Sequence, residues 1–179
     1  QERSAIRYRK RSVEDENWIK AFLKRAAFGV LATSYNDQPF TNTNLFVYDE
    51  AQGCIYLHTA LTGRTRTNVE HNPNVCFTVS EMGRLLPADV ALEFSVEYAG
   101  VVVFGRANLL EEETAKTHAL QMLLDKYAPH LQRGHDYRAI TAAELARTAV
   151  YQIDIEEWSG KLKQVDPDFP GAYSYRPKD

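Results

Sequence analysis

The residues best suited to chemistry lie in one stretch, residues 58–73. A strand-like run ends at Thr59, and Arg64 and Arg66 follow at the start of a short helical pattern. The unpaired N–H groups of a helix start attract anions, and guanidinium groups match the oxygens of a phosphate. The stretch therefore predicts a phosphate-binding site.

Two common nucleotide motifs are absent from this stretch. It contains neither the Gly-x-x-x-x-Gly-Lys of a P-loop nor the Gly-x-Gly-x-x-Gly of a dinucleotide fold. Arginine and threonine also populate ordinary solvated helix starts. From the residues alone, a purely structural role stays open beside the phosphate site.

The elements that must position this stretch are mainly strands. Apolar, β-rich runs separated by turn residues predict strands over 28–34, 40–48, 54–59, 75–79, 94–110 and 150–155. Helical patterns begin at Ser12, where Asp15 would complete a capping box, near Arg64, at Glu111 and at Thr141. Residues 82–92 are expected to form a loop.

These elements predict an α+β, mainly antiparallel β fold: a six-stranded barrel with flanking helices. The 179 residues favour one domain over 1–179, with a basic arm at 1–11 and an extended tail at 163–179. The net charge of −3 gives no general attraction to nucleic acid or to anionic membranes. No apolar run is long enough to span a bilayer, no secretory signal is visible, and we expect a cytoplasmic protein.

Neither a disulfide framework nor a metal site is expected. The two cysteines, Cys54 and Cys76, lie in apolar runs and read as small buried hydrophobic residues. The five histidines show no helical metal-ligand spacing.

The stretch resembles the FMN-binding segment of the pyridoxamine 5′-phosphate oxidase-like split-barrel superfamily. Thr59 falls on that family's threonine, Gly63 on its serine, Arg64 on its arginine, and Asn72-Pro73 on its Asn-Pro. Residues 156–160, Glu-Glu-Trp-Ser-Gly, resemble the family's last motif. The Gly-Val-Leu-Ala-Thr run at 29–33 and the His-x-Ala-x-x-Gly-Arg at 58–64 are similar to the subgroup of nitroimidazole-resistance reductases.

The resemblance implies a split β-barrel that binds FMN. It implies that Arg64 binds the FMN phosphate and that His58, beside the flavin, is a catalytic proton donor. The full set of cofactor-binding residues that it implies is Asn42, Thr43, Asn44, His58, Thr59, Gly63, Arg64, Thr65, Arg66, Trp158 and Lys161.

The chain also departs from the true oxidases. Thr43 and Tyr48 stand where those enzymes carry a second phosphate-binding arginine and a lysine, and Thr65 replaces the lysine after Arg64. The Arg-Leu-His substrate motif is missing after Gly160. We therefore do not expect pyridoxamine 5′-phosphate oxidation.

The expected function is that of an FMN-dependent oxidoreductase acting on a small organic molecule. The electron donor would be NAD(P)H or another reductant, nitro-compound reduction is one option, and a homodimer is expected. The alternative is a non-catalytic flavin- or haem-binding carrier or sensor. An empty barrel that serves only for dimerisation, and a deazaflavin in place of FMN, also stay open.

Overall fold

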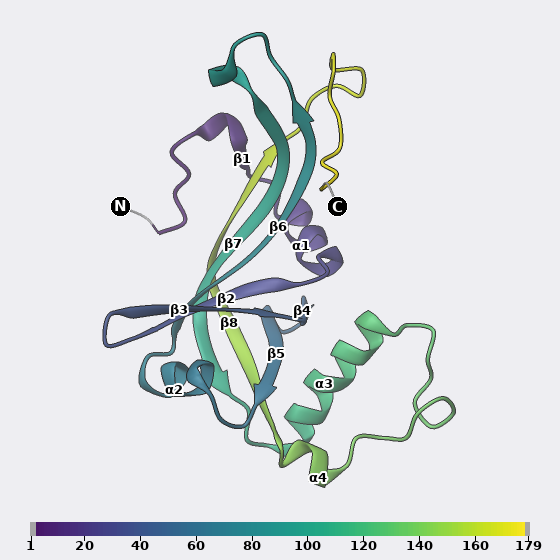
Figure 1. Cartoon of the computed structure of the whole chain (residues 1–179). Helices are drawn as coiled ribbons and strands as arrows, with labels where there is room; N and C mark the ends of the chain where they lie inside the picture. The colour runs from purple at the N-terminus through teal and green to yellow at the C-terminus, as the bar shows by residue number, and fades with distance from the viewer. Residues whose placement is uncertain (1–2, 178–179) are drawn as a thin grey trace.

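The computed structural model describes residues 3–177, so residues 1, 2, 178 and 179 of the predicted arm and tail lie outside the described range. One antiparallel sheet in the order β3-β2-β6-β7-β8-β5-β4 dominates it, and β1 pairs with β8 (Figure 1). The strands are β1 Ser12–Val13, β2 Gly29–Tyr35, β3 Gln38–Asn44, β4 Phe46–Asp49, β5 Cys54–Ala60, β6 Asn74–Leu86, β7 Ser95–Leu109 and β8 Thr148–Lys163.

Four α-helices flank the sheet: α1 Glu16–Arg25, α2 Arg64–His71, α3 Glu113–Tyr127 and α4 Ala142–Leu145. Two 3-10 turns, Arg9–Arg11 and Ala91–Glu93, complete the elements. The predicted cap of α1 is wrong. Asp15 caps the helix by accepting from the backbone N–H of Asn17, because Ser12 is held in β1 opposite Lys161.

The α+β, mainly antiparallel prediction is confirmed, and residues 3–177 form eight strands in place of the six predicted. The run 40–48 is divided at the exposed Leu45 into β3 and β4, and β1 is added. The expected loop at 82–92 is wrong in its first half. There β6 continues to Leu86, because Leu85 and Leu86 pair with Val96 and Ser95 of β7.

Two apolar clusters form the core, and β5 separates them. Ile55 and Leu57 belong to the larger cluster, in which α1 packs against the sheet. Cys54 and Tyr56 point the other way, into a second cluster with Leu123 of α3. This alternation follows from the two-residue period of a strand. Strand β5 therefore contacts a different apolar cluster on each of its faces.

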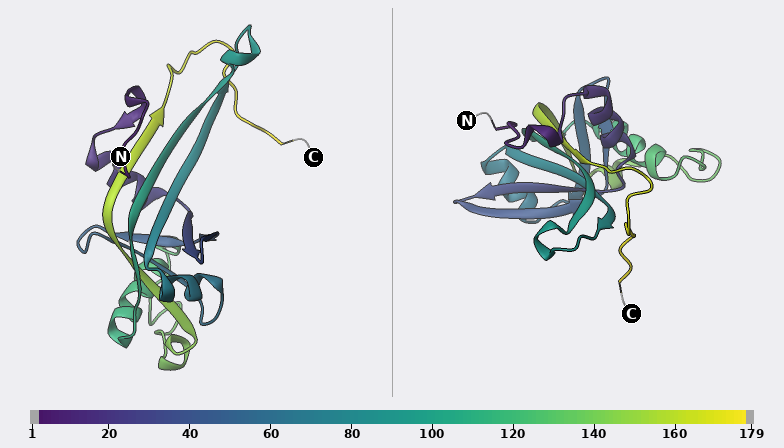
Figure 2. Two further views of the ribbon diagram at one scale, coloured as in Figure 1. Left: turned by 90° about the vertical axis from the view of Figure 1, so that its left-hand side faces the viewer. Right: turned by 90° about the horizontal axis from the view of Figure 1, so that it is seen from above.

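The long strands β6 and β7 form a ribbon that projects well beyond the other strands (Figure 2, left). At the ribbon's far end, Glu97 pairs with Arg84, whose guanidinium also donates to backbone oxygens of residues 165–167 in the C-terminal tail. Over residues 3–177, no helix combines the length and apolarity that crossing a membrane requires.

Candidate functional site

The start of α2 exposes a set of anion-binding groups. Gly63 caps the helix with φ 143°, a backbone angle that residues with a side chain rarely adopt. No side chain caps this end, and the first bond of the helix runs from Thr67 N–H to the Gly63 carbonyl. The N–H groups of residues 64–66 are therefore available to an anion, as at other uncapped helix starts.

The two arginines of this helix start differ in what they contact. Arg66 donates to the Glu70 carboxylate at 2.7 Å and to the Leu61 carbonyl at 3.0 Å. Arg64 is exposed and lies over the Phe40 ring at 5.5 Å, and it has no carboxylate or carbonyl partner among residues 3–177. Arg64 is thus the guanidinium that can pair with a phosphate.

Two of the predicted threonines, Thr65 and Thr59, lie next to the start of α2. Thr65 is buried, and its hydroxyl accepts from the Asn42 amide at 3.3 Å. The Thr59 hydroxyl lies 3.1 Å from the hydroxyl of the buried Tyr151. Desolvation raises the pKa of Tyr151, which keeps this phenol neutral. We define the phosphate cradle as Thr59, Gly63, Arg64 and the backbone of residues 64–66.

The register of β3 divides the three predicted flavin contacts on this strand. Asn42 and Asn44 lie opposite Leu31 and Gly29 of β2, on the face that carries α2. Thr43 alternates with them and faces the other side of the sheet. Only the two asparagines are therefore on the same face as the phosphate cradle.

Two asparagines fix the position of α2: Asn68 within the helix, and the C-cap Asn72, which belongs to the Asn-Pro motif of the family resemblance. The Asn68 amide donates to the Thr33 hydroxyl at 2.9 Å, and the Asn72 amide donates to the Ser34 hydroxyl at 3.1 Å. The asparagines are four residues apart on one helix face, and the hydroxyls are consecutive on β2. Their polar type and i, i+4 spacing could have indicated this contact.

The structure does not bring Trp158 and Lys161 to the cradle. Ala149 of β8 lies opposite Thr59, and Trp158 follows nine residues later, about 30 Å away along an extended strand. Trp158 instead packs against Tyr48, with ring centroids 6.4 Å apart. Within one chain, neither residue shares a site with the cradle.

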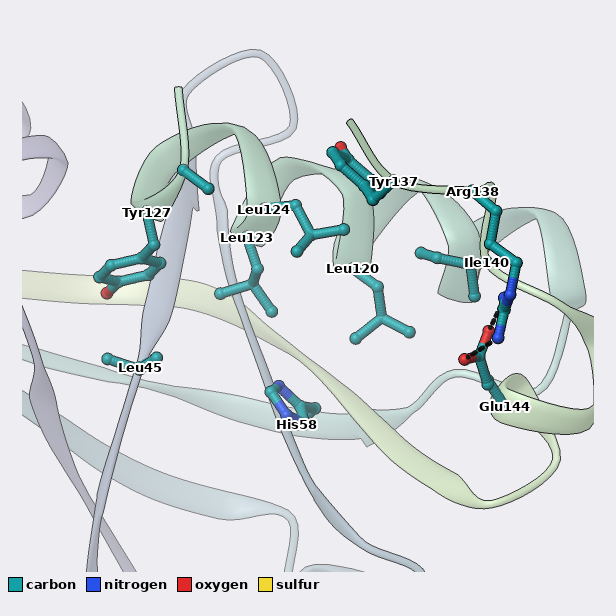
Figure 3. Close-up of a pocket in the computed structure, with 11 residues that line it drawn as sticks. Leu45, His58, Leu120, Leu123, Leu124, Tyr127, Tyr137, Arg138, Ile140 and Glu144 are labelled. Atoms are coloured by element: carbon teal, nitrogen blue, oxygen red, sulfur yellow. Dashed lines mark hydrogen bonds and ion pairs between the residues drawn. The ribbon is translucent and has the colours of Figure 1, made fainter. Parts of the chain in front are cut away.

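His58 also faces away from the cradle. It alternates with Thr59 on β5 and points toward α3 (Figure 3). One side of the ring is open to solvent, yet desolvation by the apolar wall lowers the pKa of His58 below its ordinary value. Among residues 3–177, no side chain or backbone group hydrogen-bonds to this ring. His58 is therefore a neutral imidazole with free nitrogens.

The imidazole lies at an apolar cavity of about 590 Å³, which we call the α3 cavity. Leucines of α3 cover it, and an Arg138–Glu144 ion pair at 2.8 Å lies at its edge (Figure 3). The lining consists of Leu45, His58, Leu120, Leu123, Leu124, Tyr127, Ala128, Tyr137, Arg138, Ile140 and Glu144.

The α3 cavity combines one unpaired nitrogen ligand with hydrocarbon walls. Such walls suit a large apolar ring system, and a neutral imidazole suits a transition metal held by that ring. No three His, Cys, Asp or Glu side chains of residues 3–177 converge on a common metal position. A metal in this cavity would therefore have to arrive within a prosthetic group.

The antiparallel sheet with its flanking helices defines the fold as a split β-barrel. Residues 15–162 match the family described as pyridoxamine 5′-phosphate oxidase, and the chain belongs to that family. The predicted family is thereby confirmed.

Solved structures agree with this assignment. The flavocytochrome Anf3 from Azotobacter vinelandii is 26% identical with a TM-score of 0.80, over 98% of this chain and 86% of that one. An FAD- and haem-binding protein from Mycobacterium smegmatis is 21% identical with a TM-score of 0.78, over 88% and 76%. A candidate 5-nitroimidazole antibiotic resistance protein from Bacteroides thetaiotaomicron is 20% identical with a TM-score of 0.70, over 84% and 86%. A comparison with curated protein sequences found no match.

Proposed function

We propose that this chain is a flavin-dependent oxidoreductase whose cofactor phosphate binds at the start of α2. One observation carries the proposal: Arg64 presents an unpaired guanidinium beside three free backbone N–H groups. This donor set fits a phosphate, for which charge-assisted hydrogen bonds and a helix start are the usual partners. FMN is the smallest flavin that meets this requirement, and it is the one that the sequence resemblance implies.

The residues of the chain bind and orient the cofactor. Arg64 and the N–H groups of residues 64–66 would hold the phosphate. The Thr59 hydroxyl, which donates to the Ala60 carbonyl at 2.9 Å, would have to exchange that partner to donate to the phosphate. Asn42 and Asn44 would offer amides to the flavin from β3. When bound, a flavin supplies electron and hydride transfer, for which NAD(P)H is the proposed donor and a small organic molecule, such as a nitro compound, the proposed acceptor.

The α3 cavity favours a haem as a second cofactor. A flavocytochrome and an FAD- and haem-binding protein share this fold, and His58 would bind the haem iron, since its imidazole has a lowered pKa and no hydrogen-bond partner among residues 3–177 and lines an apolar cavity. Arg138 at the cavity edge would meet a carboxylate of the ring only by exchanging its partner Glu144. When bound, a haem supplies one-electron and O₂ chemistry. We therefore propose His58 as a haem ligand in preference to a proton donor at the flavin.

A homodimer is part of the proposal. Trp158 and Lys161 could meet a flavin only if a second copy brought them to the cradle of the first. The outer face of β6, β7 and β8 supports this arrangement, because it presents half-buried Val102 and Phe104 around a cavity of about 540 Å³. Two equivalent cradles in a C2 dimer would follow. Sedimentation equilibrium would test this, since a monomer at micromolar concentration would contradict it.

Reduction and reoxidation test the function directly. The full-length protein, loaded with flavin under anaerobic conditions, should lose its blue absorption on addition of NADH or NADPH. A nitroarene or another small acceptor should restore that absorption. A bound flavin that neither NADH nor NADPH reduces, and that no small acceptor reoxidises after reduction with dithionite, would favour the carrier alternative. Failure to bind flavin would reject the proposal.

A further inference from the structure

Strand β8 has an open edge between the two strands that pair with it on one side. Its pairing with β5 ends at Asp154, opposite Cys54, and its pairing with β1 begins at Gly160, opposite Val13. Within residues 3–177, the segment 155–159 of β8 therefore has no neighbouring strand on this side. A cavity of about 300 Å³ borders the segment, and we call it the β8-edge cavity. It is lined by Glu16 of α1, Tyr48 of β4, Gly53 and residues 155–158 of β8.

The β8-edge cavity is rich in negative charge. Three of its lining residues are glutamates: Glu16, Glu156 and Glu157. The basic partner that they have among residues 3–177 is Arg3, which pairs with Glu156 at 2.9 Å and with Glu157 at 2.7 Å. Arg3 also lowers the pKa of Glu157, so this carboxylate stays ionised. One guanidinium thus faces three carboxylates, and the excess of negative charge attracts a cation.

Two acceptor atoms at this cavity lack a hydrogen-bond donor. Tyr48 is 5% exposed, and its hydroxyl has no hydrogen-bond partner among residues 3–177. Desolvation raises the pKa of Tyr48, so the phenol is neutral and its oxygen can accept. The Oε2 atom of Glu157 is likewise buried without a partner in the described part of the chain. Because buried polar atoms are nearly always paired, these two atoms indicate a donor that a ligand supplies.

Aromatic rings form the apolar part of the cavity wall. Trp158 stands edge-on to Tyr48, with ring centroids 6.4 Å apart and ring planes at 68°. Tyr48 belongs to the larger core cluster and Trp158 packs against that cluster, so both rings are held in place before a ligand binds. The faces of tyrosine and tryptophan rings attract cations, and this preference has the same sign as that of the carboxylates.

We propose that the β8-edge cavity binds a small organic cation through a protonated primary amine. An ammonium carries three N–H donors and no acceptor, which matches the carboxylates and the Tyr48 oxygen. Glu16 would pair with the ammonium, Tyr48 would accept one of its N–H groups, and the Trp158 ring would contact the attached carbons. A metal ion is disfavoured, because no three His, Cys, Asp or Glu side chains of residues 3–177 converge on one position. The inference goes beyond the proposed flavin function, since this cavity shares no residue with the phosphate cradle or the α3 cavity of the same chain.

Calorimetric titration of the full-length protein with n-butylamine at neutral pH tests the site. We expect a dissociation constant below about 1 mM, and binding at least about tenfold weaker for n-butanol, which has the same carbon chain and no charge. Tyr48→Phe should weaken butylamine binding by about tenfold, the scale of one lost hydrogen bond to a charged group. Tyr56→Phe is the matched control: it removes a hydroxyl from an equally buried tyrosine of the α3 cluster and should leave the affinity unchanged.

A second pair of variants tests the charge of the site. Glu16→Gln, at the exposed start of α1, should also weaken butylamine binding by about tenfold. Arg3→Ala should strengthen that binding, because it removes a competing cation from Glu156 and Glu157.

Three results would overturn the proposal. The first is equal affinity for butylamine and butanol, or no binding of butylamine at about 10 mM. The second is unchanged affinity in both Tyr48→Phe and Glu16→Gln, which would place the amine elsewhere on the chain. The third is displacement of butylamine by an equimolar amount of Ca²⁺ or Mg²⁺, which would assign the cavity to a metal ion.

Discussion

His58 and Thr59 are consecutive residues of β5, and their side chains lie on opposite faces of the sheet. Thr59 contacts Tyr151 beneath the phosphate cradle, and His58 lines the α3 cavity. Only the thickness of one strand separates the two environments, because consecutive side chains of β5 point to opposite faces. One strand can therefore serve a polar, phosphate-binding site and an apolar, imidazole-containing site at the same point of the fold.

Arg64→Ala should weaken flavin binding by about 1–3 kcal/mol, because a charge-assisted hydrogen bond to the phosphate is lost. Arg66→Ala is the matched control, since that guanidinium is already engaged by Glu70 and Leu61. The measurement is calorimetric titration of both variants with the same flavin. Equal losses of flavin affinity in the two variants would show that Arg64 binds the phosphate no more strongly than Arg66 does, contrary to the structure.

His58→Ala should abolish haem binding and leave the flavin affinity within about twofold of the parent. The reason is that the imidazole faces only the α3 cavity. His118→Ala, which removes a histidine of α3 paired with Asp49 at 3.4 Å, should retain haem. Titration with haem, followed by the Soret absorption, compares the three proteins. Retention of full haem affinity in His58→Ala would show that another residue binds the haem iron.

Haem binding should persist as the pH falls below the ordinary histidine pKa of about 6.5. Desolvation lowers the pKa of His58, so the neutral imidazole that a metal requires remains available at lower pH than for a solvated histidine. Haem affinity measured from pH 7.5 to 5 should therefore stay constant through pH 6.5 and fall only at lower pH. A loss centred at or above 6.5 would mean that the imidazole is not desolvated.

Lys126 should make the stability of the fold increase with pH above 8. Its half-buried ammonium donates to the carbonyls of Ala26 and Phe46, and desolvation lowers its pKa to about 8. Between pH 8 and the ordinary value of 10.5 the unfolded chain binds more protons, so the free energy of unfolding rises with pH.

Urea denaturation at pH 7.5 and 9.5 measures this effect against Lys126→Met. The parent should gain stability relative to the variant at the higher pH. Parallel behaviour of the two proteins would show that Lys126 titrates in the folded state as it does in the unfolded chain.

Glu97→Gln should release the C-terminal tail. The Arg84 guanidinium lowers the pKa of Glu97 to about 2, so the carboxylate contributes stability above its ordinary value of 4.5 and loses it as the pH falls from 4.5 to 2. Hydrogen exchange at residues 165–173 should accelerate in the variant at neutral pH. Glu81→Gln, which removes an exposed partner of Arg25, is the control and should leave the tail protected.

The local part of the site could be predicted from the sequence, because its residues are neighbours in the chain. Thr59, Gly63 and Arg64 lie within six positions, and a strand followed by an uncapped helix start brings them together. The sequence also predicts that His58 and Thr59 lie on opposite faces of the strand, since side chains on a strand alternate between faces. The family resemblance implied that both residues contact one flavin, which does not take that alternation into account.

The α3 cavity could not be predicted, because it depends on long-range packing. The leucines at 120, 123 and 124 share one helical face, a pattern that is typical of core packing. In the structure, part of this face borders a cavity. Residues of the segment 137–144, which follows α3 in the chain, form another part of the lining of that cavity. The position of Trp158 and Lys161 relative to the cradle likewise depends on how β8 extends, and on a second chain.

Simultaneous loading with both cofactors tests the central claim most directly. The full-length protein would be saturated with flavin and haem together, freed of excess, and its absorption spectrum and extracted chromophores quantified. The structure predicts one flavin and one haem per chain, with a flavin band and a Soret band in the same sample. Displacement of one chromophore by the other, or a total of one cofactor per chain, would contradict the assignment of two separate sites on the two faces of β5.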